Sequence, residues 1–258
     1  MAYPWLLPGY VTLNINWLNL AIDIGNTRVK AGVFSGNEIV KTFSFDHWSL
    51  DIVVELKSAL DIDRIIAGSV RSLNKKEKIW FKHAPDAMLL DHLTPLPVRI
   101  GYHTPETLGA DRVAVIVGAW NMFKHESSLV IDAGTCITYD LIQSDGTYLG
   151  GNISPGLRMR LMAMHKFTQK LPQTDLSEWL IDMGTDTKTA LQAGAQTGAM
   201  YEIRGFIQAY RELFEKLNIL LTGGDSHFFV NKLKTKIFVT PELALQGLNG
   251  ILEFNLTR

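Results

Sequence analysis

Short apolar runs separated by glycine-rich and polar turns occupy two stretches of the chain. From about residue 19 to 45, the runs LNLAIDI, VKAGVF and EIVKTFSF are divided by the turns GNTR and SGN. Runs of this length with turn residues between them predict an antiparallel meander of three strands. The same pattern recurs from residue 127, where SSLVIDAGT, CITYDLIQ and TYLGGNI follow one another. We therefore expect two meanders, one in each half of the chain.

Helical periodicity fills most of the remaining sequence. In residues 49–60, Ile52, Val53, Leu56 and Leu60 fall on one helix face, and Ser49 can cap the first turn. The sequence predicts further helices at 74–83, in VAVIVGAWNMF, at about 156–167, at 187–217, shortly after Asp225 and from Pro241 onward. Shorter strands are expected at RIIAGSV, AMLLD, NILLTGG and IFVT, with LPVRI extended.

This order of elements predicts an α/β protein with two lobes. A chain of 258 residues fits either one large domain or two compact lobes of about 120 residues each, and we favour two lobes. We place the first lobe at 19–123 and the second at 124–258. Residues 1–18 are apolar but carry no Lys or Arg, and two prolines interrupt any helix, so we interpret them as an N-terminal extension rather than a membrane anchor or secretory signal.

Charge and cysteine content narrow the classes of function. The 25 Lys and Arg balance 26 Asp and Glu, so the chain has no overall field that would attract nucleic acid, and we expect no nucleic-acid partner. A single cysteine, Cys136, excludes an intrachain disulfide and is typical of a reducing, cytoplasmic compartment. The seven histidines show no repeated metal-binding spacing, and the lysines at 75, 76, 78 and 82 are expected to form a solvated helix face.

Each meander begins with a strand that ends in an acid and a glycine turn. These turns read DIGNT at 23–27 and DAGT at 132–135. Backbone N–H groups and hydroxyls in a concave loop with a carboxylate at its rim can hold phosphates and a metal ion. One such loop could equally be a plain hairpin turn, but two, one in each half, favour phosphate binding. A third segment, LLTGGD at 220–225, suits close backbone approach to an adenine or ribose.

Taken together, the motifs resemble a known family. The two acid-bearing hairpins resemble the phosphate-binding hairpins of the actin, hexokinase and acetate kinase superfamily, which implies a duplicated, ribonuclease H-like fold with a mixed sheet flanked by helices in each lobe. The ordered set DIGNTRVKAG, TPETLGADRVA, DAGT with Thr138 and Asp140, GGNISPG, the Leu171–Pro172 pair and TGGD resembles type III pantothenate kinase from residue 19 to about 252.

That resemblance implies an activity and its cofactors. The family transfers the γ-phosphoryl group of ATP to the primary (4′) hydroxyl of pantothenate, the first step toward coenzyme A. It implies Mg²⁺ with ATP, a monovalent cation such as K⁺ or NH₄⁺, and a homodimer whose active site lies near the subunit interface. Two other readings stay open: a non-catalytic accessory relative that acts in gene regulation, and a kinase of the same fold with another acceptor.

The resemblance also assigns roles to residues. It implies ATP contacts at Asp23, Ile24, Gly25, Asn26, Thr27, Arg28, Val29, Lys30, Thr135, Gly223 and Gly224. It implies pantothenate contacts at Tyr102, Gly109, Ala110, Asp111, Arg112 and, from the partner subunit, Thr187. Asp132 is the expected ligand of the monovalent cation, and Asp23 is expected to organise Mg²⁺ through water.

Asp111 is the expected general base, because a primary alcohol attacks phosphorus well only when a carboxylate can accept its proton. From the residues alone, Asp111 could equally be a carboxylate that stabilises the first turn of a helix. Thr187 could likewise be only the N-terminal residue of a long helix. The glycines at 194, 198 and 205 and the apolar face of the 187–217 helix suggest that part of this helix packs at a subunit interface.

Overall fold

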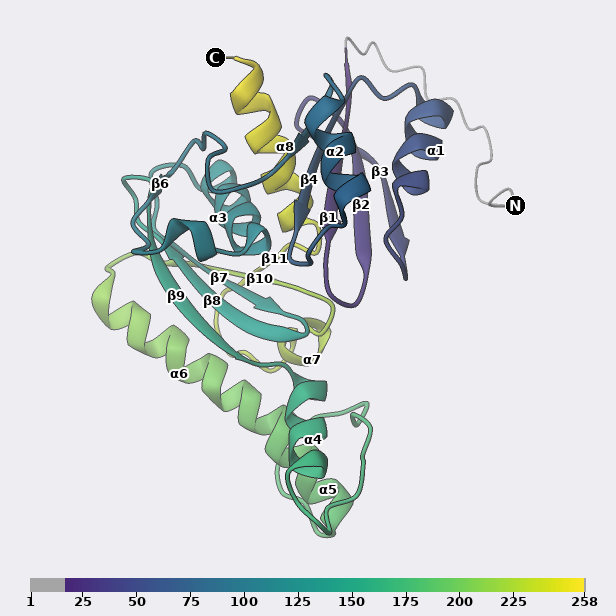
Figure 1. Cartoon of the computed structure of the whole chain (residues 1–258). Coiled ribbons are helices and arrows are strands. Elements are labelled where there is room, and N and C mark those ends of the chain that lie inside the picture. Colours follow the sequence, from purple (N-terminus) through teal and green to yellow (C-terminus); the bar gives the residue numbers. More distant parts are fainter. Residues whose placement is uncertain (1–16, 258) are drawn as a thin grey trace. The chain divides into compact units, whose positions relative to one another are not determined.

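The computed structural model describes residues 17–257. Residues 1–16 of the predicted extension 1–18 therefore lie outside the described residues. The chain forms two compact units that are not contiguous in sequence (Figure 1). Unit 1 takes the described part of Met1–Pro95 together with Gly109–Ala114 and Ala244–Arg258, and unit 2 takes Leu96–Leu108 and Val115–Leu243. These units divide the chain at other positions than the lobes 19–123 and 124–258, which stay a prediction.

Unit 1 is built on a five-stranded mixed sheet with the order β3-β2-β1-β4-β5. The predicted meander is confirmed as β1 (Leu18–Ile24), β2 (Val29–Ser35) and β3 (Glu38–Phe45), which pair in antiparallel fashion. The strands β4 (Arg64–Ser69) and β5 (Ala87–Leu89) run parallel to β1 on its other side. Since β1 lies at the centre of this sheet, the residue at its carboxyl end is supported from both sides.

Helices cover both faces of the unit 1 sheet. On one face, α1 (Leu50–Leu60) and α2 (Lys75–His83) pack on the core that includes Ile22 and Ile65. On the other face lies α8 (Leu243–Leu256), whose Leu245 would be 3.2 Å from a Cβ at Gly32. The predicted cap is present, because Ser49 accepts a hydrogen bond from the Asp51 N–H and so satisfies an otherwise unpaired donor.

Unit 2 repeats this sheet plan. Its order is β11-β10-β7-β8-β9-β6, and the antiparallel meander β7-β8-β9 again has two parallel strands, β10 and β11, beyond its first strand. The strands are β6 (Arg99–Ile100), β7 (Ser128–Ala133), β8 (Cys136–Ile142), β9 (Thr147–Pro155), β10 (Asn218–Thr222) and β11 (Phe238–Val239). Apart from β6, each strand has a counterpart in unit 1, so the duplicated mixed α/β fold predicted from the sequence is confirmed.

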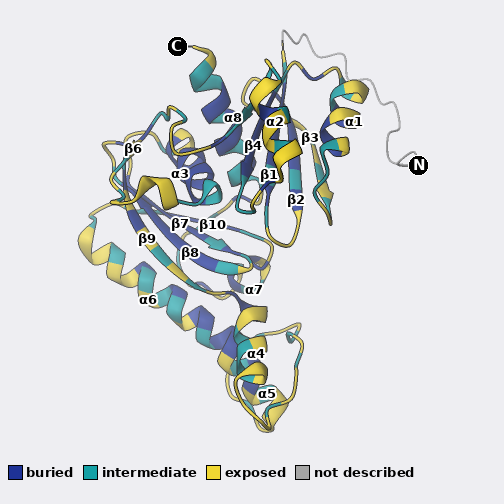
Figure 2. Cartoon of the chain, in the orientation of Figure 1, coloured by how far each residue is buried: buried dark blue, intermediate teal, exposed yellow. Residues whose placement is uncertain are grey.

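The helices of unit 2 surround the second sheet. They are η1 (Pro105–Thr107), most of α3 (Ala110–Met122), α4 (Leu157–Lys166), α5 (Thr187–Gln192), η2 (Ala193–Thr197), α6 (Gly198–Leu213) and α7 (His227–Val230). Figure 2 shows β7 and β8 largely buried and the outer face of α6 exposed. Within residues 17–257, no helix is both long and apolar enough to cross a lipid bilayer.

The long helix predicted at 187–217 is present from Thr187 to Leu213, with a π-helical segment inside it and an earlier end than predicted. The structure interrupts it with the π-helical segment η2, and it ends at Leu213 because Phe214 is extended. The side chains of Gln192 and Gln196 donate to the carbonyls of Asp175 and Ser177, which ties the π segment to the chain beside it. Such insertions are the usual form of π-helix within an α-helix.

Most of the apolar face of this helix packs within its own chain. Phe206, Tyr210, Phe214 and Leu217 pack against the core of unit 2, so most of that face covers the chain's own sheet. A Cβ at any of the glycines 194, 198 and 205 would meet open space, so close packing within the chain does not explain them. Packing of the rest of the helix against a second subunit stays a prediction.

Candidate functional site

The first acid-bearing hairpin lies at the carboxyl end of β1. Asp23 stands opposite Lys30 on β2 and beside Gly68 on β4. The Gly25 N–H donates to the Arg28 carbonyl at 3.0 Å, and a Cβ at Gly25 would lie only 2.9 Å from that oxygen. Residues 26–28 are exposed. The turn is therefore tight, and it presents polar groups beside a carboxylate, as phosphate binding requires.

Unit 1 brings Asp111 to the same end of its sheet. A Cβ at Gly68, the β4 residue beside Asp23, would lie 3.5 Å from the Cβ of Ala110. Ala110 begins α3, so the first turn of α3 packs where β1 and β4 end. Asp111 Oδ1 accepts the Arg112 N–H at 2.8 Å, and a Cβ at Gly109 would be 2.4 Å from that oxygen. A side chain at position 109 would thus displace the Asp111 carboxylate.

The electrostatics of Asp23 report this proximity. Burial is the largest cause that raises the pKa of Asp23, the Asp111 carboxylate raises it further, and Lys30 lowers it, with a result of about 6. Burial disfavours an ionised carboxyl, and a second carboxylate nearby repels its negative charge. The predicted metal residue and the predicted base are therefore close enough to interact. Paired carboxylate oxygens are also the donors that a hard cation such as Mg²⁺ prefers.

The second acid-bearing hairpin lies at the carboxyl end of β7 in unit 2. Asp132 stands opposite Thr138 on β8 and beside Thr222 on β10. Directly after β10, Gly223 has a φ of +93°, and a Cβ there would lie 2.4 Å from Asp132 Oδ1. The Asp225 N–H donates to the Ala133 carbonyl at 2.9 Å. The predicted DAGT and TGGD segments thus lie against each other, and only glycine fits at position 223.

A third glycine segment completes this arrangement. The Gly156 N–H donates to the Thr135 carbonyl at 3.1 Å, and a Cβ at Gly156 would be 2.3 Å from the Gly134 carbonyl oxygen. Two residues later, Arg158 pairs with Asp225 at 2.9 Å. Sequence reasoning included Gly156 and Asp225 in motifs of the family resemblance, but it assigned no individual role to either residue or to Arg158. The SPG sequence just before a helix was the available signal, because glycine there permits close backbone approach.

The two remaining predicted substrate positions belong to other parts of unit 2. The half-buried Tyr102 ring stacks on Tyr148, with 6.1 Å between the ring centroids and 26° between the planes. Thr187 is exposed and is the first residue of α5, after the capping residue Asp186. Figure 1 shows α5 at the end of α4 that is remote from the β7–β8 turn. Within one chain, the structure therefore does not bring Thr187 to the second hairpin.

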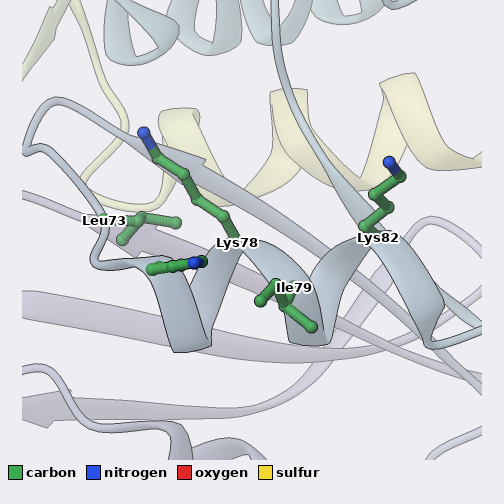
Figure 3. Close-up of a pocket in the computed structure, with 5 residues that line it drawn as sticks. Leu73, Lys78, Ile79 and Lys82 are labelled. Carbon is green, nitrogen blue, oxygen red and sulfur yellow. The ribbon is translucent and has the colours of Figure 1, made fainter.

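A shallow pocket of about 370 Å³ lies on the outer face of α2. The residues that line it belong to neither hairpin. Leu73, Lys75, Lys78, Ile79 and Lys82 line it, and Figure 3 shows the long side chains of Lys78 and Lys82 extending from the helix. The lysines are exposed, and no predicted site residue lines the pocket. Among the described residues, no group of three or more His, Cys, Asp or Glu side chains is arranged to hold a metal ion.

Comparison with known proteins decides the family. A family model described as type III pantothenate kinase matches residues 19–209, which is well over half of the chain and includes both hairpins and the α3 segment. This chain belongs to the type III pantothenate kinase family. A type III pantothenate kinase from Bacteroides fragilis is 45% identical over 239 residues, which cover 92% of this chain and 98% of that protein. One from Flavobacterium johnsoniae is 37% identical, with 92% and 98% covered.

Solved structures place the family in its fold class. A Campylobacter jejuni protein assigned to the Baf family of transcriptional activators superposes with a TM-score of 0.61 at 24% identity, covering 93% of this chain and all of that one. The activator of 2-hydroxyisocaproyl-CoA dehydratase from Clostridium difficile, solved with ADPNP, superposes with a TM-score of 0.56 at 13% identity, covering 93% and 96%. At these identities the likeness concerns the fold alone.

Proposed function

We propose that this protein transfers the γ-phosphoryl group of ATP to the primary hydroxyl of pantothenate, the first step of coenzyme A biosynthesis. The observation that carries the proposal is the position of Asp111 beside Asp23 in unit 1, which gives a candidate base and a candidate metal carboxylate in one place. Membership of the type III pantothenate kinase family supplies the substrate class, since relatives that span nearly this whole chain bear that name.

Asp111 acts as the general base. Its carboxylate accepts the proton of the pantothenate hydroxyl as the oxygen attacks the γ-phosphorus, and the bond from phosphorus to the β-phosphate oxygen breaks. The Arg112 N–H donates to Oδ1 of Asp111 at 2.8 Å, which orients the carboxylate that receives the proton. Gly109, Ala110, Arg112 and Tyr102 contact pantothenate in this proposal.

The hairpin residues bind the nucleotide. Residues 23–30 and Thr135 contact the phosphates, and Gly223 and Gly224 lie against the nucleoside. When bound, Mg²⁺ neutralises charge that develops on the phosphate oxygens. Asp23 fits a water-mediated role toward that ion, because a nearby cation would stabilise a carboxylate whose pKa is raised by burial and by the repulsion from Asp111. Asp132 fits K⁺ or NH₄⁺, because its carboxylate oxygen and the Ala133 carbonyl oxygen lie together beside Gly223. Such cations accept several oxygen ligands.

We further propose a cytoplasmic homodimer in which Thr187 reaches pantothenate in the partner subunit. Large exposed apolar side chains are concentrated in residues 157–213 of unit 2, which also contain Thr187. They are Met159, Met162, Phe167, Trp179, Met183, Tyr201 and Leu213. Apolar side chains gathered on one segment favour a protein partner over solvent. A chain whose only cysteine is Cys136 agrees with a reducing compartment.

The test is an assay of purified protein with ATP, Mg²⁺ and pantothenate, with and without K⁺, in which product mass is followed. We expect phosphopantothenate from the wild type, and a loss of about 10²- to 10⁴-fold in kcat for Asp111→Asn with nucleotide binding retained. Asp91→Asn, an exposed carboxyl in the same unit, is the matched control. Full activity in Asp111→Asn would reject the assigned base.

The same assay separates the competing functions. Acetate, a hexose or water in place of pantothenate tests whether the acceptor is different, since each would give a distinct product mass or free phosphate. A non-catalytic relative would bind ATP by calorimetry and turn over none of these acceptors. Family membership favours pantothenate over the other acceptors.

A further inference from the structure

The backbone fixes where Tyr102 begins. The short strand β6 runs parallel to β9, with Ile100 paired to Tyr148. The next N–H, that of Gly101, donates to the Tyr148 carbonyl at 2.8 Å. A Cβ at Gly101 would also lie 2.8 Å from that oxygen, so the two backbones are in direct contact. The backbone directly before Tyr102 is therefore hydrogen-bonded to Tyr148 at the edge of the sheet.

An irregularity in β9 makes room for the Tyr102 ring. The pairing of β8 with β9 shifts register between Leu141 and Ile142, and Gly150 in the matching part of β9 has a φ of +112°. A Cβ at Gly150 would lie 3.4 Å from Cδ2 of Tyr102, so the ring rests against this glycine. Bulges of this kind re-aim side chains beside active sites. The Tyr102 ring also stacks on the ring of Tyr148.

Buried hydrogen bonds hold the hydroxyl end of Tyr148. Its hydroxyl donates to Oδ1 of Asp140 at 2.7 Å, and the Thr138 hydroxyl donates to Oδ2 at 2.8 Å. Asp140 is 0% exposed and Tyr148 is 1% exposed. Hydrogen bonds to a buried carboxylate are short and strong, and their geometry is well defined. The stacked ring beneath Tyr102 is therefore held in one place by the interior of unit 2.

We propose that Tyr148, fixed by Asp140, is a positioning residue that sets the plane of Tyr102 for binding the acceptor substrate. This inference rests on the proposed function, in which Tyr102 contacts pantothenate. Tyr148 is too buried to touch a ligand, so it acts through Tyr102. Pantothenate carries an apolar dimethyl carbon that an aromatic ring can cover. If the Tyr102 ring is already held in a fixed plane, its side chain loses little entropy when the substrate binds.

The chain offers a matched control in Tyr139. This residue lies on β8 of the same sheet, is 0% exposed, and donates its hydroxyl to Glu202 at 2.8 Å. Tyr148→Phe and Tyr139→Phe thus each remove one hydroxyl that is bonded to a carboxylate. Both variants should lose similar thermal stability, so stability alone cannot separate them. Only Tyr148 stacks on Tyr102, whereas the Tyr139 ring packs against Phe206.

The measurement is the full set of kinetic constants for wild type and both variants. We expect Tyr148→Phe to raise KM for pantothenate about three- to tenfold, with kcat and KM for ATP within about twofold of wild type. Tyr139→Phe should change none of the three by more than about twofold. Equal KM values for pantothenate in the two variants, or an equal rise in KM for ATP, would overturn the inference.

A double-mutant cycle tests the route through Tyr102. If Tyr148 acts by orienting that ring, Tyr148→Phe should change KM for pantothenate no further once Tyr102→Ala is present. Additive effects would mean that Tyr148 acts by another route, and the inference would be wrong. Wild-type protein that turns over no pantothenate would instead reject the proposed function, and this is seen before any variant is compared.

Discussion

Replacement of Asp23 by Asn should stabilise the fold while it removes activity. In the folded protein the pKa of Asp23 is raised from its usual 3.8 to about 6, first by burial and then by Asp111. At low pH the carboxyl is protonated in both the folded and unfolded states, so its burial causes no loss of stability through ionisation. As the pH rises from about 4 to about 6, the unfolded chain ionises first and the folded state loses relative stability. A difference of about two pH units, at 1.36 kcal/mol per unit, gives about 3 kcal/mol at neutral pH.

The assay is urea unfolding of wild type and Asp23→Asn from pH 4 to pH 8, without nucleotide or divalent cation. The free energies of unfolding should coincide near pH 4, and the variant should be more stable by up to about 3 kcal/mol above pH 6. Asp111→Asn should show a smaller gain over the same range, because Asp111 is the second cause of the raised pKa and not the first. Asp46→Asn, an exposed carboxyl after β3, is the control and should show no such trend.

One result would refute this reasoning. A stability difference that is the same at every pH, or a variant less stable than wild type at pH 7, would mean that the Asp23 carboxylate does not destabilise the folded state. The predicted gain is large against the 5 to 15 kcal/mol that holds an ordinary domain together. A destabilising group that persists at such a place is typical of a functional site.

Three further predictions concern the rest of the framework. Mg²⁺ with ATP should raise the melting temperature of wild type more than that of Asp23→Asn, as measured by scanning fluorimetry, and equal shifts would argue against a cation role for Asp23. Gly223→Ala should destabilise by about 1 to 3 kcal/mol and displace Asp132, because its Cβ would lie 2.4 Å from Oδ1. Gly224→Ala, where a Cβ meets open space, should cost less than about 1 kcal/mol in the same unfolding experiment. Asn249→Ala should cost about 1 to 3 kcal/mol, because it removes buried bonds that hold α8 to the first sheet, and an unchanged midpoint would contradict this.

The meanders and the two acid-bearing turns could be predicted because their signals are local. Strand-length apolar runs, turn residues and the acid-glycine pairs all lie within a few residues of one another. The capping residue Ser49 was predictable for the same reason, since a cap needs only the first turn of its helix. The interruption of the 187–217 helix was not, because it depends on bonds from Gln192 and Gln196 to carbonyls that lie earlier in the chain.

The approach of distant segments could not be read from the chain. The sequence names Asp111 as a candidate but does not indicate that Ala110 packs where Gly68 leaves space beside Asp23. It likewise gives no reason for Gly156 to contact the turn after β7. Such contacts depend on which strands become neighbours, and that is decided by the packing of whole sheets rather than by any local pattern.

The duplicated sheet explains how one strand plan yields two different chemical environments. In each unit the central strand ends in an acid, Asp23 or Asp132, and the parallel neighbour strand supplies a glycine beside it. On β4 the glycine is within the strand, and the space it leaves admits the first turn of α3, which brings a second carboxylate. After β10 the glycine, Gly223, has a positive φ and lets the backbone itself approach the acid. In the proposed function, the first arrangement brings the base Asp111 beside the hairpin that binds phosphate and Mg²⁺. The second lets the backbone approach Asp132, the proposed ligand of the monovalent cation, so a small difference in glycine placement separates the proposed roles of two otherwise similar hairpins.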